Sequence, residues 1–478
     1  MLFAGCLAVS NESLWIDEAH TAYKATQPDW FSFHHALMED RGSDINMPVY
    51  MAFMWLWDKI VGSRPEWLFR ASNVVWYAVF QLGMLAALRS RPRLALGCAL
   101  AVAFSPFVWY YMNEARPYVM QLAGAGLVTA FFVRRSVASG AGPWWTTTFG
   151  VGLVVLCGSS LLGVLWAGSA IVLLGRQWWR REFIVRRGDL MAIGGTLALL
   201  AGLAAYYLRV MLAEDAKPTV GETGLLNLAF SFYELLGISG LGPWRYAIRE
   251  GGLAAFRPFL LPVALSGVLL GGLLLAAAFA FWRENRRAFW PLAIAWIAPI
   301  VALFILGSLT HARVLGRHLA PALPALMLLL GFALVRLWAD PRGSALAVCA
   351  VLVSAASAAS FRFSSRHAKE DSRTALAEAS QIVASGGDVW WAGAKRLLRY
   401  YQTPFSLPEE RERGVIYLRN PSSDVLGPLR EPDAVFFSRP DIFDENQHLQ
   451  HWLTEHGYSA ARRWQGLTLW RRVAEEVK

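Results

Sequence analysis

Long apolar runs, separated by short polar stretches, fill the first three quarters of this chain of 478 residues. Runs of about 17 to 25 residues are long enough for a helix to cross a bilayer core of about 30 Å. The clearest runs cover residues 67–88, 94–112, 117–133, 189–212, 258–282, 288–309, 318–338 and 343–361. A longer apolar block, residues 143–175, is interrupted by "CGSS" at 157–160. The pattern predicts an α-helical polytopic membrane protein.

Clusters of arginine between these runs predict the orientation of the chain. They lie at residues 89–93, 134–135, 176–187 and 283–287, and at Arg336 with Arg342. Because short loops rich in Lys and Arg stay cytoplasmic, consecutive clusters must be joined by an even number of crossings. This parity predicts that block 143–175 is a tight hairpin of two helices rather than one long helix.

The same parity places the segment before residue 67 on the outer face. The apolar core of residues 46–57, "NMPVYMAFMWLW", is too short to cross, and its aromatic side chains suit a helix that lies in the membrane interface. Residues 11–66 then form an outer loop. Since Met1 to Val9 is too short for a span, we expect a truncated first span, about eleven spans in all, and a transmembrane domain over residues 1–361.

The composition changes after Phe361. The segments "DVWWAG", "GVIYL" and "DAVFFSRP" are typical of short strands, and "DSRTALAEASQIVAS" and "DENQHLQHWLTEHG" are typical of helices. Strands that alternate with helices predict a small α/β domain over residues 362–478, on the outer side of the membrane.

Composition supports the membrane assignment and narrows the choice of partners. Hydrophobic residues make up 55% of the chain and charged residues 17%, whereas a soluble domain has about 25% charged residues. The net charge of +10 reflects loop arginines that set orientation, so we expect no nucleic-acid partner. The four cysteines lie in apolar stretches without metal-ligand spacing, which argues against disulfides and a cysteine zinc site.

Four outer-face stretches carry charged side chains that could take part in chemistry. They are Asp17 with Glu18; Glu114 with Arg116; Glu214 and Asp215 with Lys217; and His311, Arg313, Arg317 and His318. Each stretch alone is more simply explained as loop charge solvated by water and lipid headgroups. Together they are complementary, because carboxylates can act as a general base or hold a divalent cation, and arginines can bind phosphate through two hydrogen bonds.

Several motifs, in this order, resemble the GT-C glycosyltransferases, in the branch of bacterial relatives of protein O-mannosyltransferases and of lipid A aminoarabinose transferase. "LWIDEAHTAYKA", "NMPVYMAFMWLWDKIVG" and "EWLFRASNVVWYAVF" resemble the opening of these enzymes, "YYMNEARPYVM" their second acidic motif, and "GRHLAPALP" a later arginine-proline segment. "HAKEDSRTALAEAS" and "GDVWWAG" resemble the start of their extracytoplasmic domain. The resemblance covers nearly the whole chain, although Asn46 and Met47 replace a lysine and a proline that are common in the family.

This resemblance implies that a sugar is moved from a polyprenyl-phosphate donor to a glycan, lipid or protein acceptor outside the bacterial cytoplasmic (inner) membrane. Asp17 would be the catalytic base and Glu114 a second acidic group, with Glu18 as a supporting carboxylate or metal ligand. The donor-phosphate candidates are Arg116, Lys217, Arg313, Arg317 and His318. A divalent metal, Mg or Mn, is an open possibility, and the active site and C-terminal domain would face outward among membrane lipids.

Two functions from other classes compete with this one. A transporter or flippase of lipid-linked sugars would place ionisable groups near the bilayer midplane, whereas here they gather at the predicted outer ends of the spans. A membrane-anchored binding protein that uses only its α/β tail would leave the charged loops around Asp17 and Glu114 unexplained. Surface chemistry is therefore the favoured function.

Overall fold

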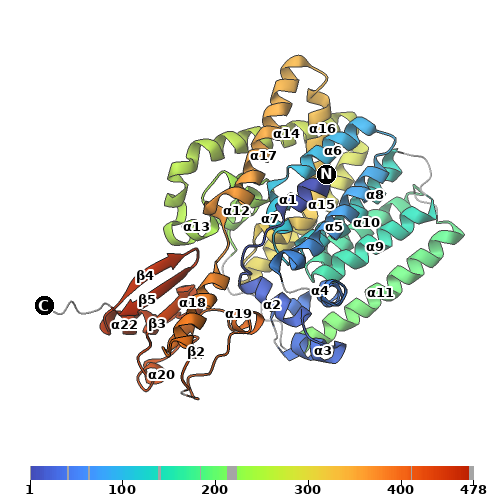
Figure 1. The fold of residues 1–478 in the computed structure, drawn as a ribbon. Coiled ribbons are helices and arrows are strands. Elements are labelled where there is room, and N and C mark those ends of the chain that lie inside the picture. Colours follow the sequence, from blue (N-terminus) through green and yellow to red (C-terminus); the bar gives the residue numbers. More distant parts are fainter. Residues whose placement is uncertain are drawn as a thin grey trace. The chain divides into compact units, whose positions relative to one another are not determined.

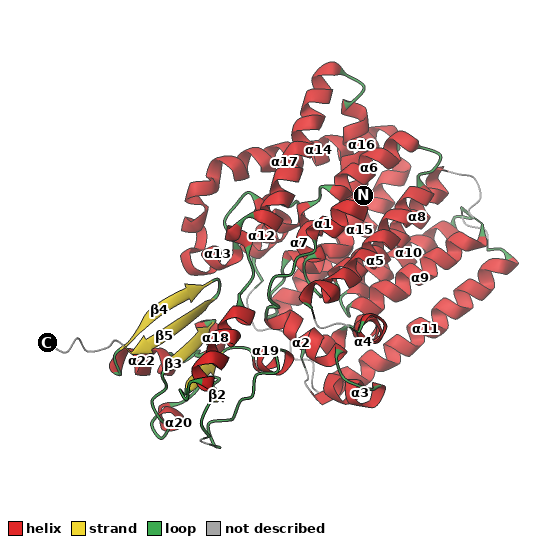
Figure 2. Ribbon diagram, viewed as in Figure 1, coloured by secondary structure: helices red, strands yellow, loops and turns green. Residues whose placement is uncertain are grey.

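The chain forms two compact units in a computed structural model that describes residues 2–39, 42–62, 65–137, 142–182, 185–212, 223–410 and 412–472. The first unit contains Met1–Ser10 and Pro28–His367, and the second contains Asn11–Gln27 and Ala368–Lys478. Figures 1 and 2 show that the first unit is helical and that the second contains the sheet. The sequence-based domains divide the chain differently, because they assign residues 11–27 to the first domain and end it at residue 361.

The long helices of the first unit follow the predicted apolar runs, and shorter helices lie between them. They are α1 (Leu2–Ala8), α3 (Trp30–Glu39), η1 (Ser43–Asn46), α4 (Pro48–Val61), α5 (Glu66–Ala87), α6 (Pro92–Ala103), α7 (Pro106–Met112), α8 (Tyr118–Val137), α9 (Pro143–Ser159), α10 (Gly163–Trp179), α11 (Arg187–Leu212), α12 (Leu225–Leu235), η2 (Ile238–Gly240), α13 (Arg245–Gly251), η3 (Gly252–Phe259), α14 (Leu260–Glu284), α15 (Arg286–Leu309), η4 (Gly316–Ala322), α16 (Leu323–Leu337), α17 (Pro341–Phe363) and η5 (Ser365–His367). The hairpin predicted for residues 143–175 is confirmed as α9 and α10. The segment expected in the interface is helical as α4, and its place at the membrane surface stays a prediction.

One predicted span is broken. Residues 94–112 form α6 and α7, which meet at a bend of 55°. Pro106 is the first residue of α7, and proline lacks the backbone N–H that would continue the helix. The hydroxyl of Ser105 caps α7 by accepting a hydrogen bond from the backbone N–H of Val108 at 3.4 Å, so a new helix starts in a different direction.

The chain is a multi-pass membrane protein. Within the described residues, five helices are long and apolar enough to cross a membrane, or six if the bent α6–α7 pair counts as one span. They are α11, η3 with α14, the part of α15 from Phe289, η4 with α16, and α17. Helix α5 is less apolar because it contains the buried polar residues Arg70, Asn73 and Gln81. The expected count of about eleven spans stays a prediction.

Glycines allow some of these helices to pack backbone against backbone. A Cβ atom on Gly97 of α6 would lie 2.6 Å from the carbonyl oxygen of Gly331 in α16. In the same way, a Cβ atom on Gly152 of α9 would lie 2.9 Å from the carbonyl oxygen of Gly124 in α8. Small residues at such crossings are typical of helix packing in membranes, where close van der Waals contact replaces the hydrophobic effect.

The second unit is an α/β fold around a sheet of five strands in the order β2-β1-β3-β5-β4. The strands are β1 (Val389–Ala392), β2 (Val415–Tyr417), β3 (Ala434–Ser438), β4 (Tyr458–Trp464) and β5 (Leu467–Arg472), and the helices are α2 (Ile16–Ala25), α18 (Ser372–Ala384), α19 (Lys395–Tyr400), α20 (Ser423–Leu426), α21 (Pro440–Phe443) and α22 (His448–Glu455). Strand β1 pairs in parallel with both β2 and β3. Its Trp390 and Trp391 are fully buried, as expected of a parallel strand covered on both faces.

The C-terminal hairpin β4–β5 is absent from the sequence-based prediction. Strand β5 pairs antiparallel with β3 and with β4, which is an edge strand and has a register shift between Ala460 and Arg462. Most side chains of β4 are exposed, so the strand has little apolar alternation that a sequence pattern could reveal. The three strands and two helices that were predicted in this region are confirmed as β1, β2, β3, α18 and α22.

Candidate active site

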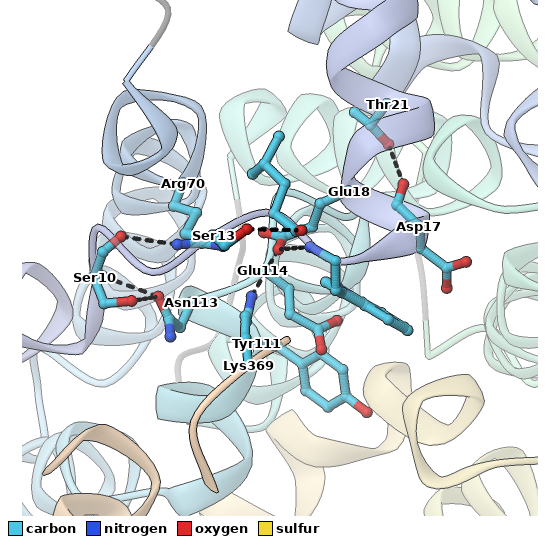
Figure 3. Close-up of polar contacts among 12 residues, drawn as sticks. Ser10, Ser13, Asp17, Glu18, Thr21, Arg70, Tyr111, Asn113, Glu114 and Lys369 are labelled. Atoms are coloured by element: carbon cyan, nitrogen blue, oxygen red, sulfur yellow. Dashed lines mark hydrogen bonds and ion pairs between the residues drawn. The ribbon is translucent and has the colours of Figure 1, made fainter. Parts of the chain in front are cut away.

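The predicted acidic pair lies in the first turn of α2, in the second unit. Adjacent residues of a helix point in directions about 100° apart, and Figure 3 shows the Asp17 carboxylate pointing away from Glu18. The Glu18 carboxylate accepts hydrogen bonds from the backbone N–H of Trp15 at 3.4 Å and from the Lys369 Nζ at 2.9 Å. Glu18 is fully buried, whereas Asp17 is half-buried. The two carboxylates therefore have different surroundings.

The second predicted acidic motif forms the turn between α7 and α8, in the first unit. Glu114 is buried there. The Asn73 side-chain amide donates to the Glu114 carbonyl oxygen at 2.6 Å, and the Asn113 side-chain oxygen accepts from the Ser10 backbone N–H at 2.9 Å. Arg70 donates to the Ser10 carbonyl oxygen at 3.0 Å (Figure 3). Polar side chains of α5 thus connect this turn with the segment that follows α1.

Arg116, in the same turn, forms a buried ion pair. Its Nη1 lies 2.6 Å from the Asp44 Oδ1, and both side chains are at most 4% exposed. Its Nη2 donates to the Ser43 hydroxyl at 3.1 Å. The pair connects the turn after α7 with η1, and an ion pair with so little access to water persists only with good geometry on both sides.

A second, partly buried cluster centres on Arg245, the first residue of α13. Its Nε donates to the Glu234 Oε1 at 2.6 Å, and its Nη atoms donate to the hydroxyl groups of Tyr110 at 3.2 Å and Tyr111 at 2.8 Å. The other Glu234 oxygen accepts from the Gly316 backbone N–H at 3.0 Å. Burial alone would lower the pKa of Arg245, but the surrounding acidic groups, of which Glu234 acts most strongly, together outweigh burial and raise it, so the guanidinium stays charged.

The arginine-proline segment lies beside this cluster. The Arg317 guanidinium lies over the Tyr118 ring at 5.8 Å, and the rings of Tyr118 and Tyr111 are in contact, with their centroids 4.7 Å apart. The charges that act on the Tyr111 phenol come from Arg245, Glu234, Glu114 and Arg317. Tyr111 is therefore where the second acidic motif, α12, α13 and the arginine-proline segment meet.

The remaining candidates for binding the donor phosphate lie in η4, in the loop before η4, and outside the described residues. The His318 Nδ1 accepts from the Leu315 backbone N–H at 3.2 Å, within the first turn of η4. Arg313 is exposed. Lys217, with Glu214 and Asp215, lies outside the described residues.

The Arg245 cluster lines a partly open pocket of about 370 Å³, a volume that includes the solvent at its mouth. Its walls are mainly aromatic, with side chains from α7, α12, α13 and α17. The polar groups among them include Glu234, Arg245, Ser239, His367 and the hydroxyls of Tyr110 and Tyr111. A mostly apolar concave site with a few convergent polar groups is the usual character of a small-molecule or cofactor site.

Sequence reasoning missed Arg245, Glu234 and Asp44. The stretch around Glu234, "LAFSFYELLG", contains one carboxylate in an apolar helix, and such a group in a membrane protein indicates a functional or structural partner. That signal was available, but nothing local to the sequence identifies Arg245 or Gly316 as the partner.

The described residues contain no group of three or more His, Cys, Asp or Glu side chains that could hold a metal ion. A divalent metal, Mg or Mn, stays a prediction from the sequence.

Comparisons with known proteins identify the fold. Neither models of known families nor curated protein sequences match this chain. Its structure is similar to ArnT from Cupriavidus metallidurans bound to undecaprenyl phosphate, with a TM-score of 0.54, 13% identity, and coverage of 99% of this chain and 97% of that chain. The apo form of the same ArnT gives a TM-score of 0.54 at 14% identity, over 99% of this chain and 96% of that one. Arabinofuranosyltransferase AftD from Mycobacteria gives a TM-score of 0.40 at 15% identity, over 99% of this chain and 39% of that one.

The similarity to ArnT extends over both units, which are helical and α/β respectively. It confirms the fold that the sequence motifs implied, a GT-C-type membrane unit with a small C-terminal α/β unit.

Proposed function

We propose that this protein is a membrane glycosyltransferase that moves a sugar from a polyprenyl-phosphate donor to a hydroxyl of an acceptor on the outer face of the cytoplasmic membrane. The observation that carries the proposal is the partly buried cluster of Arg245, Glu234, Tyr110 and Tyr111, which lines an aromatic pocket beside Arg317. It occurs in a chain with the fold of ArnT, a protein whose crystal structure holds undecaprenyl phosphate.

The first unit supplies groups suited to the donor phosphate. Arg317 can donate two parallel hydrogen bonds to phosphate oxygens. Arg245 already donates to Glu234 and to the two tyrosine hydroxyls, so it would orient these hydroxyls toward the pocket and add positive charge. As the bond from the sugar to the phosphate breaks, negative charge grows on the departing phosphate oxygen. Fixed donors and cations in a buried site stabilise such charge strongly.

Asp17 is the proposed general base. In the reaction, the acceptor hydroxyl gives its proton to the Asp17 carboxylate, the acceptor oxygen bonds to the anomeric carbon, and the electrons of the old glycosidic bond stay on the polyprenyl phosphate that leaves. Asp17 is half-buried, at the N-terminal turn of α2. Glu114 is the second acidic group of the proposal, and its charge acts on Tyr111.

The outward orientation rests on the arginine clusters in the predicted cytoplasmic loops. The sugar stays open, and the acceptor is a lipid, a polysaccharide or a protein. Deleting the gene and analysing the surface glycans would identify the acceptor class.

A direct test uses purified protein in nanodiscs. The probe is undecaprenyl phosphate carrying a radiolabelled sugar, presented with an extract of cell-envelope acceptors. We expect label to move to an acceptor as undecaprenyl phosphate is released, and Arg245→Met to reduce this by at least about tenfold, since a hydrogen bond to a charged group is worth about 1.5–3 kcal/mol. Arg257→Met, at an exposed arginine of η3, is the matched control. Movement of the intact labelled lipid between leaflets without release of undecaprenyl phosphate would instead support a flippase.

A further inference from the structure

We infer that Glu18 and Lys369 form a latch through which the C-terminal α/β unit holds the helix that carries Asp17. This inference rests on the proposed function, in which Asp17 is the base. It makes Lys369 and Glu18 positioning residues, and it gives the C-terminal unit a direct part in transfer.

The starting observation is that residues 11–27 fold as part of the second unit, although residues 28–367 separate them in sequence from the rest of it. Helix α2 packs against α19. The segment is attached near both ends as well as in the middle, so its place in the unit is defined along its whole length.

The first attachment lies just before α2. The Tyr401 hydroxyl lies 3.2 Å from the Ser13 hydroxyl and accepts from the Leu14 backbone N–H at 3.3 Å. Arg373 donates from its backbone N–H to the Ser13 hydroxyl at 3.1 Å, and from its Nη2 to the Asn11 carbonyl oxygen at 3.0 Å. Two separate elements of the C-terminal unit therefore hold the entry to α2.

The second attachment lies near the end of α2. The Arg399 Nη1 donates to the Tyr23 hydroxyl at 2.9 Å, and the Arg396 guanidinium lies over the Tyr23 ring at 4.2 Å. Both arginines belong to α19. A guanidinium stacked on an aromatic ring adds cation–π attraction to the hydrogen bond.

The latch itself lies between these two attachments and is the most deeply buried of the contacts. The Lys369 Nζ lies 2.9 Å from the Glu18 Oε2, with the Glu18 side chain inaccessible to solvent and that of Lys369 10% exposed. Removing one partner of a buried ion pair leaves an uncompensated buried charge, which is strongly unfavourable. The pair therefore constrains the rotation of α2 about its own axis.

The different roles of the Asp17 and Glu18 carboxylates follow from helix geometry. With Glu18 turned inward to Lys369, the adjacent Asp17 is turned away from it (Figure 3). The same Glu18 carboxylate also accepts from the backbone N–H of Trp15, the residue before α2, and this bond closes the first turn of the helix, which contains Asp17. In the pair "DE" at 17–18, Asp17 is therefore the proposed base, and Glu18 fixes the direction in which Asp17 points.

The test uses the full-length protein in nanodiscs with the radiolabelled undecaprenyl-phosphate-sugar probe. We expect Lys369→Met to lower kcat by about 10- to 100-fold, because a displacement of about 1 Å at a catalytic group costs about that much. The KM for the donor should stay unchanged, since the proposed phosphate-binding residues belong to the first unit. Lys369→Arg should retain most activity. The charge-swapped pair Glu18→Lys with Lys369→Glu should recover activity relative to either single change.

Hydrogen exchange supplies a readout that does not depend on catalysis. In Lys369→Met, amides of α2 should exchange faster while those of β1 stay protected. Arg472→Met, which removes an exposed pair with Glu431 at the far end of β5, should leave α2 unchanged.

The outcomes separate the latch from the proposed function. Unchanged exchange of α2 in Lys369→Met would overturn the latch whatever the activity. Faster exchange with wild-type kcat would overturn the positioning role. If the wild-type protein transfers no sugar, the proposed function fails, and the exchange experiment still decides whether the latch exists.

Discussion

The buried pair of Arg116 and Asp44 leads to a quantitative prediction about stability. The change is Asp44→Asn, which preserves the size of the side chain and one acceptor oxygen but removes the charge. In the wild-type protein the Arg116 Nη1 lies 2.6 Å from the Asp44 Oδ1, with side-chain exposures of 4% and 2%. Asparagine therefore leaves the guanidinium buried without its counter-charge.

The magnitude follows from distance and burial. Two unit charges 2.6 Å apart attract by about 6 kcal/mol at an effective dielectric of about 20. Most of this attraction offsets the cost of removing both groups from water, and loss of one partner of such a pair typically costs about 3–5 kcal/mol. Because the amide oxygen of asparagine can still accept from Arg116, we expect a value near about 3 kcal/mol.

The control is an exposed pair in the same unit. The side chains of Arg336 and Glu284 form an ion pair with exposures of 52% and 53%, and such pairs contribute about 0–1 kcal/mol. Unfolding can be followed by the fluorescence of the 22 tryptophans in a detergent titration at fixed temperature. The midpoint should move several times further for Asp44→Asn than for Glu284→Gln.

Equal shifts for Asp44→Asn and Glu284→Gln would refute this reasoning. So would a variant with wild-type stability and altered affinity for undecaprenyl phosphate. That second result would indicate that Arg116 contacts the donor, as the sequence motif suggested, rather than fixing the turn after α7.

Four further expectations concern chemistry, acid stability and orientation. Asp17→Asn should lower transfer by about 10²- to 10⁴-fold, the usual contribution of a general base, with an unchanged melting curve; near-wild-type turnover would remove Asp17 from the mechanism. Arg317→Lys keeps the charge but lacks the planar fork, so affinity for undecaprenyl phosphate in a titration should fall about tenfold, whereas an arginine that only anchors the helix would give no change. Burial, helped by the charge of Arg366, lowers the pKa of His367 to about 4, so its contribution to stability is complete above its unfolded pKa of about 6.5 and is lost as the pH falls toward 4; melts of wild type and His367→Asn between pH 7 and pH 4 should converge, and parallel curves would contradict this. In a variant without native cysteines, a cysteine at position 285 should react only with membrane-permeant reagents and one at position 425 also with impermeant ones, and labelling of 285 from outside would overturn the predicted orientation.

Much of the fold could be predicted because its signals are local. A helix that faces lipid needs an apolar run of a certain length, so the runs in the sequence mark α5, α8, α11, α14, α15, α16 and α17 with only small errors at their ends. The α9–α10 hairpin required one more step, the parity of the arginine clusters. The buried strands β1, β2 and β3 are continuous apolar segments, which can also be recognised from the sequence alone. Strands β4 and β5 cannot be recognised in this way, because most of β4 faces solvent and its pairing depends on β5.

The contacts within the candidate site, in contrast, could not be predicted from local signals. The sequence alone determined which residues have the chemistry for it, namely a carboxylate at Asp17, another at Glu114, and a guanidinium at Arg317, each in a motif that resembles the GT-C enzymes. Only the tertiary structure decided the partners. Glu18 pairs with Lys369 across 351 residues, and Arg116 with Asp44 across 72. The physical reason is that an ion pair needs only two opposite charges that the fold brings within about 4 Å, and in a chain with 45 basic and 35 acidic residues local sequence cannot say which two will meet.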